Sequence, residues 1–283
     1  MSAQIVTPEL RDWIIEQAKA GCRPEAVLAS MCASGWNEVV AEQALEATLS
    51  TYLGAGKPIE VLPPPVPVPE PDLRGSPSSV YAHDRHIQVL LTLARPRVVV
   101  FGGLLSDQEC DAIVADARPQ LARSETVDTD TGGSEVNASR TSRGMFFSRG
   151  QTPVCARIEA RIAALLGWPV EKGEGLQVLH YRPGTEYKPH YDYFDPKQPG
   201  TASVLARGGQ RVGSLVIYLS SPLRGGGTVF PEAGLCVAPI KGNAVFFSYD
   251  RPHPVTHSLH GGAPVEAGEK WVATKWLREG IFN

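Results

Sequence analysis

The sequence has 283 residues, enough to bury a full-sized core, and the length fits one main domain with a small additional one. Hydrophobic residues make up 42% and charged residues 20%, with a formal net charge of −3, which argues against nucleic acid or an anionic membrane surface as a partner. The first residues lack a basic segment followed by an apolar one, and no apolar run reaches about eighteen residues. We therefore expect a cytoplasmic protein.

The first fifty residues predict three short helices. Thr7-Pro8 supplies a capping residue followed by proline at the first helical position, Gly21 and Gly35 separate the segments, and Asn37 opens the third. We expect residues 1–53 to form a small helical module, which either binds a partner protein or is a packing appendage.

Prolines dominate the segment LPPPVPVPEP at residues 62–71. Proline at this density cannot join a helix or a central strand and favours the extended polyproline II conformation. We predict a semi-rigid linker over residues 54–79. It is either a spacer or, as a second hypothesis, an inhibitor or substrate that occupies the groove of its own chain or of a neighbour.

Short β-rich segments dominate residues 80–283. Ser106 and Glu109 form a capping box before one helix, and Thr152-Pro153 opens a second helix that ends at Gly167. The other segments favour an antiparallel double sheet or barrel, and no GxGxxG nucleotide-binding loop interrupts them. The predicted strands are HIQVLLTL, RVVVF, LQVLHYR, GSLVIYLS, TVFPE, AVFFSY and KWVATKW.

The five cysteines lie far apart, are odd in number and form no CxxC pair. This spacing argues against a disulfide framework or a zinc site. We predict reduced and mostly buried thiols at Cys22, Cys32, Cys110, Cys155 and Cys236.

The stretch YKPHYDYF places His190 and Asp192 two residues apart. Side chains with this spacing on a strand point to the same face, so both can reach one ion. With a second histidine they would form the two-histidine, one-carboxylate set of non-haem Fe(II) oxygenases. The segment RPHPVTHSLHGGAPV offers three candidates for that histidine, His253, His257 and His260.

A basic residue follows in the strand-like segment KWVATKW. Lys270 lies ten residues after His260 and would share one strand face with Val272, Thr274 and Trp276. A lysine that points into a core needs an anionic partner. The distal carboxylate of a bound 2-oxo acid would be such a partner.

The region from about Val98 to Gly280 resembles the prolyl 4-hydroxylase branch of the Fe(II)/2-oxoglutarate dioxygenases, in its soluble bacterial form. The matching motifs are RTSRGMFF, LQVLHYRPGTEYKPHYDYF, GGQRVGSLVIYLS, GGGTVFPEAG with PIKGNAVFF, and SLHGGAPVEAGEKWVATKW. The resemblance implies a double-stranded β-helix, or jelly roll. The predicted fold is therefore mainly β with flanking helices, and the jelly-roll catalytic core is preceded by the small helical domain.

The resemblance also implies a role for each of these histidines. It makes His190, Asp192 and His260 the ligands of Fe(II), and leaves His253 and His257 as structural residues or neighbours of the site.

The cosubstrate site is implied in the same way. Lys270 would pair with the C5 carboxylate of 2-oxoglutarate, and Tyr181 and Thr228 match residues that hydrogen-bond the same carboxylate. Oxygen would be the second cosubstrate, and ascorbate a supporting reductant.

Six residues match positions that line the peptide groove or, for the last two, belong to a loop that closes over it: Tyr187, Arg211, Trp276, Glu174, Arg140 and Ser142. The sequence departs from the family at two positions. Arg278 stands where relatives often have histidine, which would alter the choice of peptide, and Ala263 replaces a usual cysteine, which would change packing.

The resemblance predicts a 2-oxoglutarate-dependent dioxygenase that hydroxylates peptidyl proline and releases succinate and carbon dioxide. Two alternatives remain at this point. The same cofactors could oxidise another peptide residue or a small molecule, or the protein could sense oxygen or 2-oxoglutarate with little turnover while its N-terminal helices bind a partner protein.

Overall fold

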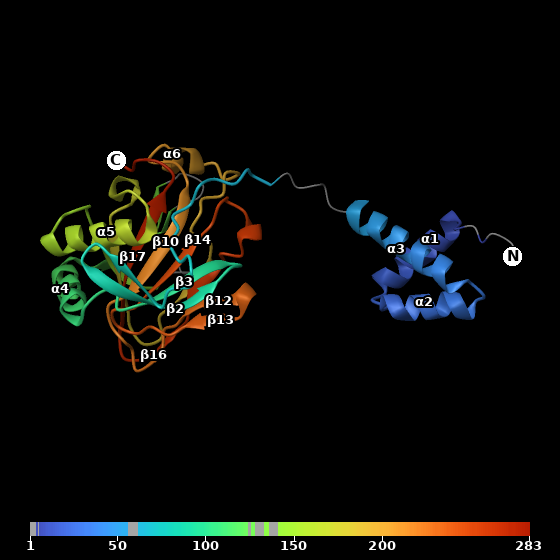
Figure 1. Ribbon diagram of the computed structural model, residues 1–283, viewed down its shortest axis with the longest axis horizontal. Helices are drawn as coiled ribbons and strands as arrows, with labels where there is room; N and C mark the ends of the chain where they lie inside the picture. Colours follow the sequence, from blue (N-terminus) through green and yellow to red (C-terminus); the bar gives the residue numbers. More distant parts are fainter. Residues whose placement is uncertain (1–3, 5, 56–61, 124–125, 128–132, 136–140) are drawn as a thin grey trace. The chain divides into compact units, whose positions relative to one another are not determined.

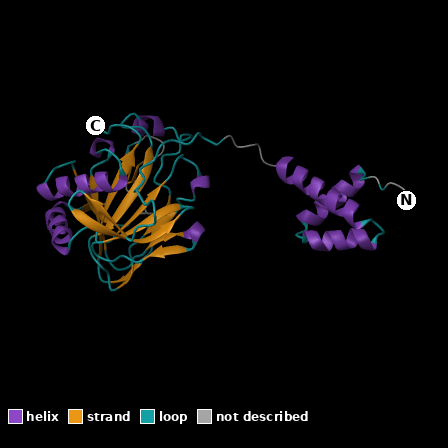
Figure 2. Cartoon of the chain, in the orientation of Figure 1, coloured by secondary structure: helices purple, strands orange, loops and turns teal. Residues whose placement is uncertain are grey.

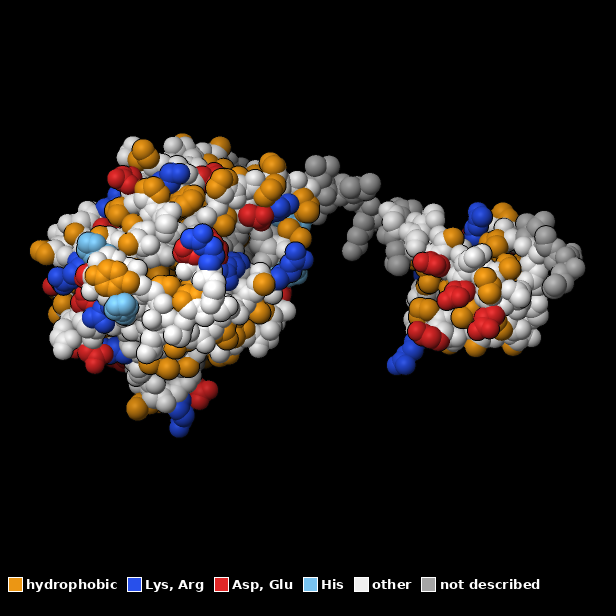
Figure 3. Space-filling model, in the orientation of Figure 1, with side chains coloured by type: hydrophobic (Ala, Val, Ile, Leu, Met, Phe, Trp, Pro, Cys, Tyr) orange, Lys and Arg blue, Asp and Glu red, His pale blue; other side chains and the backbone are white. Residues whose placement is uncertain are grey.

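A computed structural model describes residues 4, 6–55, 62–123, 126–127, 133–135 and 141–283. The chain divides into two compact units, one up to residue 62 and one from residue 63 onward (Figure 1). Figure 2 shows that the first unit is helical and the second is built mainly of strands. Hydrophobic and charged side chains are interspersed on the visible face of each unit (Figure 3).

The first unit contains the three predicted helices, α1 (Pro8–Lys19), α2 (Pro24–Ala33) and α3 (Glu38–Ala55). The Thr7 hydroxyl accepts a hydrogen bond from the backbone N–H of Leu10 and begins α1 as predicted. All three helices contribute to a small apolar core, formed by Ile14, Val27, Met31, Ala41, Ala44 and Leu45.

The second unit is built around a nine-stranded antiparallel sheet. Its strands lie in the order β1-β2-β3-β14-β10-β17-β8-β7-β4. Their bounds in that order are β1 (Ser79–Ala82), β2 (Arg85–Leu93), β3 (Arg97–Gly102), β14 (Ala244–Ser248), β10 (Arg211–Tyr218), β17 (Lys270–Arg278), β8 (Leu176–Tyr181), β7 (Arg143–Phe147) and β4 (Ala122–Arg123).

A four-stranded sheet packs against the inner face of the large one. It has the order β13-β12-β15-β9, with β13 (Leu235–Val237), β12 (Thr228–Phe230), β15 (His260–Gly262) and β9 (Tyr187–His190). Side chains from both sheets form one apolar cluster, for example Val98, Phe247 and Val272 with Phe230 and Val237. Two sheets packed in this way form a jelly roll, so the predicted fold class is confirmed.

Two short strand pairs complete the described β-structure. They are β11 (Arg224–Gly225) with β16 (Val265–Ala267), and β5 (Thr126–Val127) with β6 (Ser134–Glu135).

Helices α4 (Asp107–Ala117) and α5 (Pro153–Leu166) cover the outer face of the large sheet (Figure 1). The predicted capping box is present, since Ser106 Oγ accepts from the N–H of Glu109 and the Glu109 carboxylate accepts from the N–H of Ser106. Gly167 ends α5 with a left-handed φ of 59°. Helix α4 ends at Ala117, because Pro119 lacks an N–H and the chain continues as a 3₁₀ turn.

Smaller helical segments join the strands. They are α6 (Thr201–Leu205) and the 3₁₀ turns Arg118–Gln120, Val170–Lys172, Pro231–Ala233 and Pro254–Thr256. All five cysteines carry free thiols, as predicted, but only Cys110 and Cys155 are buried, so the prediction that most of them are buried is wrong. Among the described residues, no helix is both long enough and apolar enough to cross a membrane.

The proline-rich segment differs from the predicted linker, because from residue 63 it belongs to the second unit. The N–H of Val66 donates to the carbonyl of Asp250 at 2.8 Å, and the N–H of Glu70 donates to the carbonyl of Leu166 at 3.0 Å. Pro69 is buried against Gly213, where a Cβ atom would lie 2.8 Å from the proline ring. The buried Pro69 and these two backbone hydrogen bonds hold the segment against the second unit.

Candidate active site

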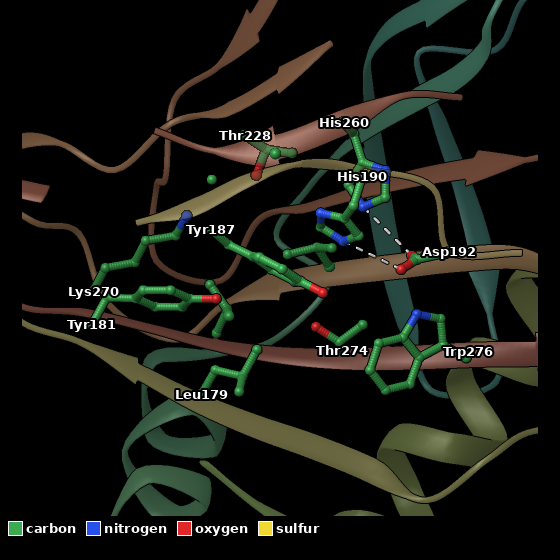
Figure 4. Close-up of a pocket in the computed structure, with 14 residues that line it drawn as sticks. Leu179, Tyr181, Tyr187, His190, Asp192, Thr228, His260, Lys270, Thr274 and Trp276 are labelled. Carbon is green, nitrogen blue, oxygen red and sulfur yellow. Dashed lines mark ion pairs between the residues drawn. The ribbon is translucent and has the colours of Figure 1, made fainter. Parts of the chain in front are cut away.

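A pocket opens between the two sheets, with a volume of about 440 Å³ including its open mouth. Figure 4 shows side chains from both sheets converging on it. The lining residues are Leu179, Tyr181, Tyr187, His190, Asp192, Val216, Thr228, His260, Gly261, Gly262, Lys270, Val272, Thr274 and Trp276. None of the prolines of residues 62–71 is among them, so the segment does not occupy the groove of its own chain in this structure.

Three predicted metal ligands meet in this pocket. His190 ends β9 and His260 begins β15, and the two residues are directly paired across these antiparallel strands. Asp192 follows just beyond the end of β9. One donor atom from each of the three lies within 4.8 Å of the others, and each imidazole Nε2 is 3.5 Å from an oxygen of Asp192 (Figure 4).

The other two candidate histidines lie elsewhere. His253 caps the 3₁₀ turn that begins at Pro254 and accepts a hydrogen bond from the N–H of Val255. His257 Nδ1 lies 3.2 Å from the carboxylate of Glu232. Strand pairing thus selects His260 from the three candidates.

Backbone carbonyls orient both imidazole rings. Nδ1 of His190 lies 2.8 Å from the carbonyl of Lys188, and Nδ1 of His260 lies 3.0 Å from the carbonyl of Ser258. Because a carbonyl can only accept a hydrogen bond, each Nδ1 carries the proton and each Nε2 presents a lone pair. This is the arrangement that metal-binding histidines adopt.

Protonation states at the cluster also suit a cation. Burial lowers the pKa of His260 to about 4, so its imidazole is neutral at pH 7. Burial alone would raise the pKa of Asp192, but His260, His190 and Arg211 outweigh it and hold that pKa well below the usual range. A neutral imidazole at His260 and an ionised carboxylate at Asp192 suit a divalent metal, so the set of two imidazoles and one carboxylate fits Fe(II).

A buried lysine lies at the other end of the pocket. Lys270 is 4% exposed, and among the described residues no carboxylate forms an ion pair with it. Burial lowers its pKa to about 8. The side chain runs beside Tyr181, with Nζ 5.4 Å from the ring centroid. A bound carboxylate would supply the missing counter-charge, so 2-oxoglutarate fits this end of the pocket.

Nearby residues shape the space around Lys270. The buried Tyr218 donates its hydroxyl proton to Thr228 Oγ1 at 2.8 Å, so the proton of Thr228 is available for another acceptor. Gly226 has a φ of +72°, and a Cβ there would lie 3.2 Å from Lys270 Cδ. The three-glycine motif therefore makes room for the lysine.

Aromatic residues form the side of the pocket near the histidines. Tyr187 stacks on the ring of His190 with a centroid distance of 3.7 Å. Trp276 is 6% exposed, and its buried Nε1 finds no hydrogen-bond partner among the residues that the structure describes. Both were predicted as groove residues, and both line the pocket.

The other predicted groove residues are placed differently. Glu174 is buried and accepts from Arg211 Nε at 2.6 Å and from Arg278 Nε at 2.7 Å, so it lies behind the pocket. Arg211 stacks over the Trp276 ring at 3.8 Å. Ser142 is 1% exposed, whereas Arg140 lies outside the described residues.

Sequence reasoning missed several residues that contact the lining of the pocket. Phe146 is 55% exposed, and its ring centroid lies 6.4 Å from that of Trp276. It follows the buried Met145 in β7, an alternation that could have indicated it. Ser214 and Tyr249, which support Asp192, gave no signal in the sequence because their contact crosses strands.

Comparison with known proteins identifies the family. The model of the 2OG-Fe(II) oxygenase superfamily matches residues 176–278. Prolyl 4-hydroxylase 2 of Arabidopsis thaliana is 39% identical over 234 residues, which are 75% of this chain and 76% of that protein. The chain belongs to the prolyl 4-hydroxylase family. Prolyl 4-hydroxylase 5 of the same plant is 42% identical over 209 residues, covering 66% of this chain and 70% of the relative.

A solved structure supports the same assignment. It is the 2OG complex of a viral collagen prolyl hydroxylase from Paramecium Bursaria Chlorella virus-1, with a TM-score of 0.50 and 29% identity, covering 64% of this chain and 95% of the viral one. The protein is thus a 2-oxoglutarate-dependent dioxygenase with a jelly-roll core. The family match spans β8 to β17 and so includes the His190, Asp192 and His260 cluster and Lys270.

Proposed function

We propose that this dioxygenase hydroxylates peptidyl proline and releases succinate and carbon dioxide. The observation that carries the proposal is one pocket that holds both the His190, Asp192 and His260 cluster and the buried Lys270, which has no carboxylate partner in the described part of the chain. The curated relatives that bear the name prolyl 4-hydroxylase support the choice of proline.

In this proposal His190 Nε2, His260 Nε2 and the carboxylate of Asp192 hold Fe(II). Bound Fe(II) would supply oxygen activation and the oxidative decarboxylation of 2-oxoglutarate. The ammonium of Lys270 binds the distal carboxylate of the cosubstrate, with Thr228 and Tyr181 beside it. The apolar pocket walls exclude water that would waste the oxidant.

The substrate side is aromatic, which suits a proline-rich peptide. Such peptides present their rings in a preformed extended helix, and grooves lined by aromatic residues bind them with little entropy to lose. We assign Tyr187, Trp276 and Phe146 to direct contact with the peptide. Arg211 and Glu174 support Trp276 from behind the pocket. From the family resemblance, we further propose that Arg140 and Ser142 belong to a loop that closes over the peptide.

The deciding experiment is mass spectrometry of proline-rich peptides incubated with enzyme, Fe(II), 2-oxoglutarate and ascorbate. We expect one added oxygen on proline, lost in Asp192→Ala and retained in Asp195→Ala, which alters an exposed aspartate three residues away. Succinate formed without peptide oxidation would reject proline as the substrate, and a panel of metabolites and other peptides would follow. Absence of succinate would favour a sensor with little turnover.

Three further proposals concern conditions and partners. Ascorbate supports turnover, so succinate formation should slow when it is omitted. The five free thiols favour a cytoplasmic location, which fractionation would test. The N-terminal helices bind a partner protein, which would be captured by the full chain and not by a chain lacking residues 1–53.

A further inference from the structure

A chain of two buried hydroxyl groups lies behind the carboxylate of Asp192. Ser214 Oγ is 2.6 Å from Asp192 Oδ2, and the same hydroxyl is 3.0 Å from the hydroxyl oxygen of Tyr249. The exposed fractions are 0% for Ser214, 2% for Tyr249 and 5% for Asp192. Ser214 and Tyr249 are thus shielded from bulk solvent, and polar groups in such places are normally hydrogen-bonded within the protein.

The direction of these hydrogen bonds follows from the number of protons. The ionised carboxylate of Asp192 can only accept, so Ser214 donates to it. That uses the one proton of the serine hydroxyl, and the bond to Tyr249 then requires the phenol to donate. Burial raises the pKa of Tyr249 well above its ordinary value, so the phenol stays protonated. The chain runs from Tyr249 through Ser214 to Asp192.

The two hydroxyl groups stand on the rigid part of the fold, whereas Asp192 does not. Ser214 lies within β10 and is paired with Phe247 on one side and with Trp276 on the other. The N–H of Tyr249 donates to the carbonyl of Val212 in the same sheet. Asp192 lies past the end of β9 in an irregular segment. The hydroxyl of Ser214, on the large sheet, thus holds the Asp192 carboxylate, whose own backbone lies outside any strand.

We propose that Ser214 and Tyr249 are positioning residues that set the orientation of the Asp192 carboxylate and thereby the affinity of the site for a divalent metal. This inference rests on the proposed function, because it takes Asp192 as a metal ligand. A carboxylate without the serine hydroxyl would turn about its side-chain torsions, and this freedom would be lost again on metal binding. Losing such a supporting bond weakens metal binding by about 10–100-fold in other proteins.

The test is the affinity of the full chain for Co²⁺, measured by titration of its visible absorption bands, with Ser214→Ala, Tyr249→Phe and the double variant. We expect Ser214→Ala to weaken binding by about 10–100-fold. Tyr249→Phe should weaken it less, and it should add nothing in the Ser214→Ala background, because Tyr249 acts through the serine. Ser248→Ala, which alters a neighbouring buried serine in β14, serves as the matched control and should bind as the wild type does.

Three outcomes would overturn the inference. The first is a folded Ser214→Ala that binds Co²⁺ within twofold of the wild type. The second, which decides the matter if Ser214→Ala does not fold, is an unchanged affinity in Tyr249→Phe. The third is a wild-type chain that does not bind Co²⁺, which would also reject the proposed metal site. Melting temperatures measured without metal separate a loss of folding from a loss of affinity.

Discussion

Replacing Lys270 with methionine should stabilise the protein in the absence of ligands while removing its affinity for 2-oxoglutarate. The lysine is 4% exposed and pairs with no carboxylate in the described part of the chain. Burial lowers its pKa from 10.5 to about 8. At 1.36 kcal/mol for each pKa unit, the folded state carries a penalty of about 3 kcal/mol at pH 7. Methionine has similar length and no charge to desolvate.

The sign of the pH dependence follows from the two pKa values. Between about pH 8 and 10.5 the unfolded chain holds a proton on Lys270 that the folded chain has released, so wild-type stability rises with pH in this window. The advantage of Lys270→Met should therefore fall from about 3 kcal/mol at pH 7 to about 1 kcal/mol at pH 9.5. For a unit of this size, about 3 kcal/mol corresponds to a rise in melting temperature of about 6–12 °C.

Differential scanning calorimetry at the two pH values measures this effect. The unfolding transition of the catalytic unit is the one whose melting temperature changes when Co²⁺ is added. Adding 2-oxoglutarate with Co²⁺ should raise the wild-type melting temperature further and leave Lys270→Met unchanged. The matched control is Lys275→Met, because Lys275 is buried on the same strand but lies 2.5 Å from the carboxylate of Glu159. Lys275→Met leaves the buried carboxylate of Glu159 without its partner and should lower the free energy of unfolding by about 3–5 kcal/mol.

The reasoning would be wrong if Lys270→Met were less stable than the wild type at pH 7. It would also be wrong if the difference between the two proteins were the same at both pH values, since the stabilisation would then not come from the charge of Lys270.

Three other substitutions test separate parts of the structure. Phe146→Ala should raise the KM for a proline-rich peptide by about tenfold, which corresponds to a loss of roughly 1.4 kcal/mol of binding free energy. The binding of 2-oxoglutarate should stay unchanged. An unchanged KM for the peptide would show that Phe146 does not contact it. Tyr218→Phe should weaken 2-oxoglutarate binding, because Thr228 loses its hydrogen-bond donor. Calorimetric titration with Co²⁺ present measures this, and the binding of oxamate, which lacks a distal carboxylate, should not change. An equal loss for both ligands would contradict this role. Arg161→Met should lower the free energy of unfolding by about 3–5 kcal/mol, because the buried guanidinium bonds both Asp84 and Glu109; denaturation at neutral pH with no measurable loss would refute it.

Local patterns in the sequence were sufficient for the elements and for much of the site. The spacing of His190 and Asp192, the capping box at Ser106 and the alternation that begins at Lys270 all depend on neighbours within a few residues. Backbone geometry translates such spacing directly into a shared face or a helix start. The family resemblance then indicated the jelly roll.

Contacts between distant segments were decided by the tertiary structure alone. The residues by themselves left three histidines open, and the pairing of β15 with β9 brings His260 to the cluster. Glu174, predicted in the groove, is buried between two arginines. Ser214, in the large sheet, hydrogen-bonds Asp192, which lies just past the end of a strand of the smaller sheet. Strand register and sheet packing are cooperative properties of the whole core, so they determine which side chains face one another, and no short stretch of sequence encodes them.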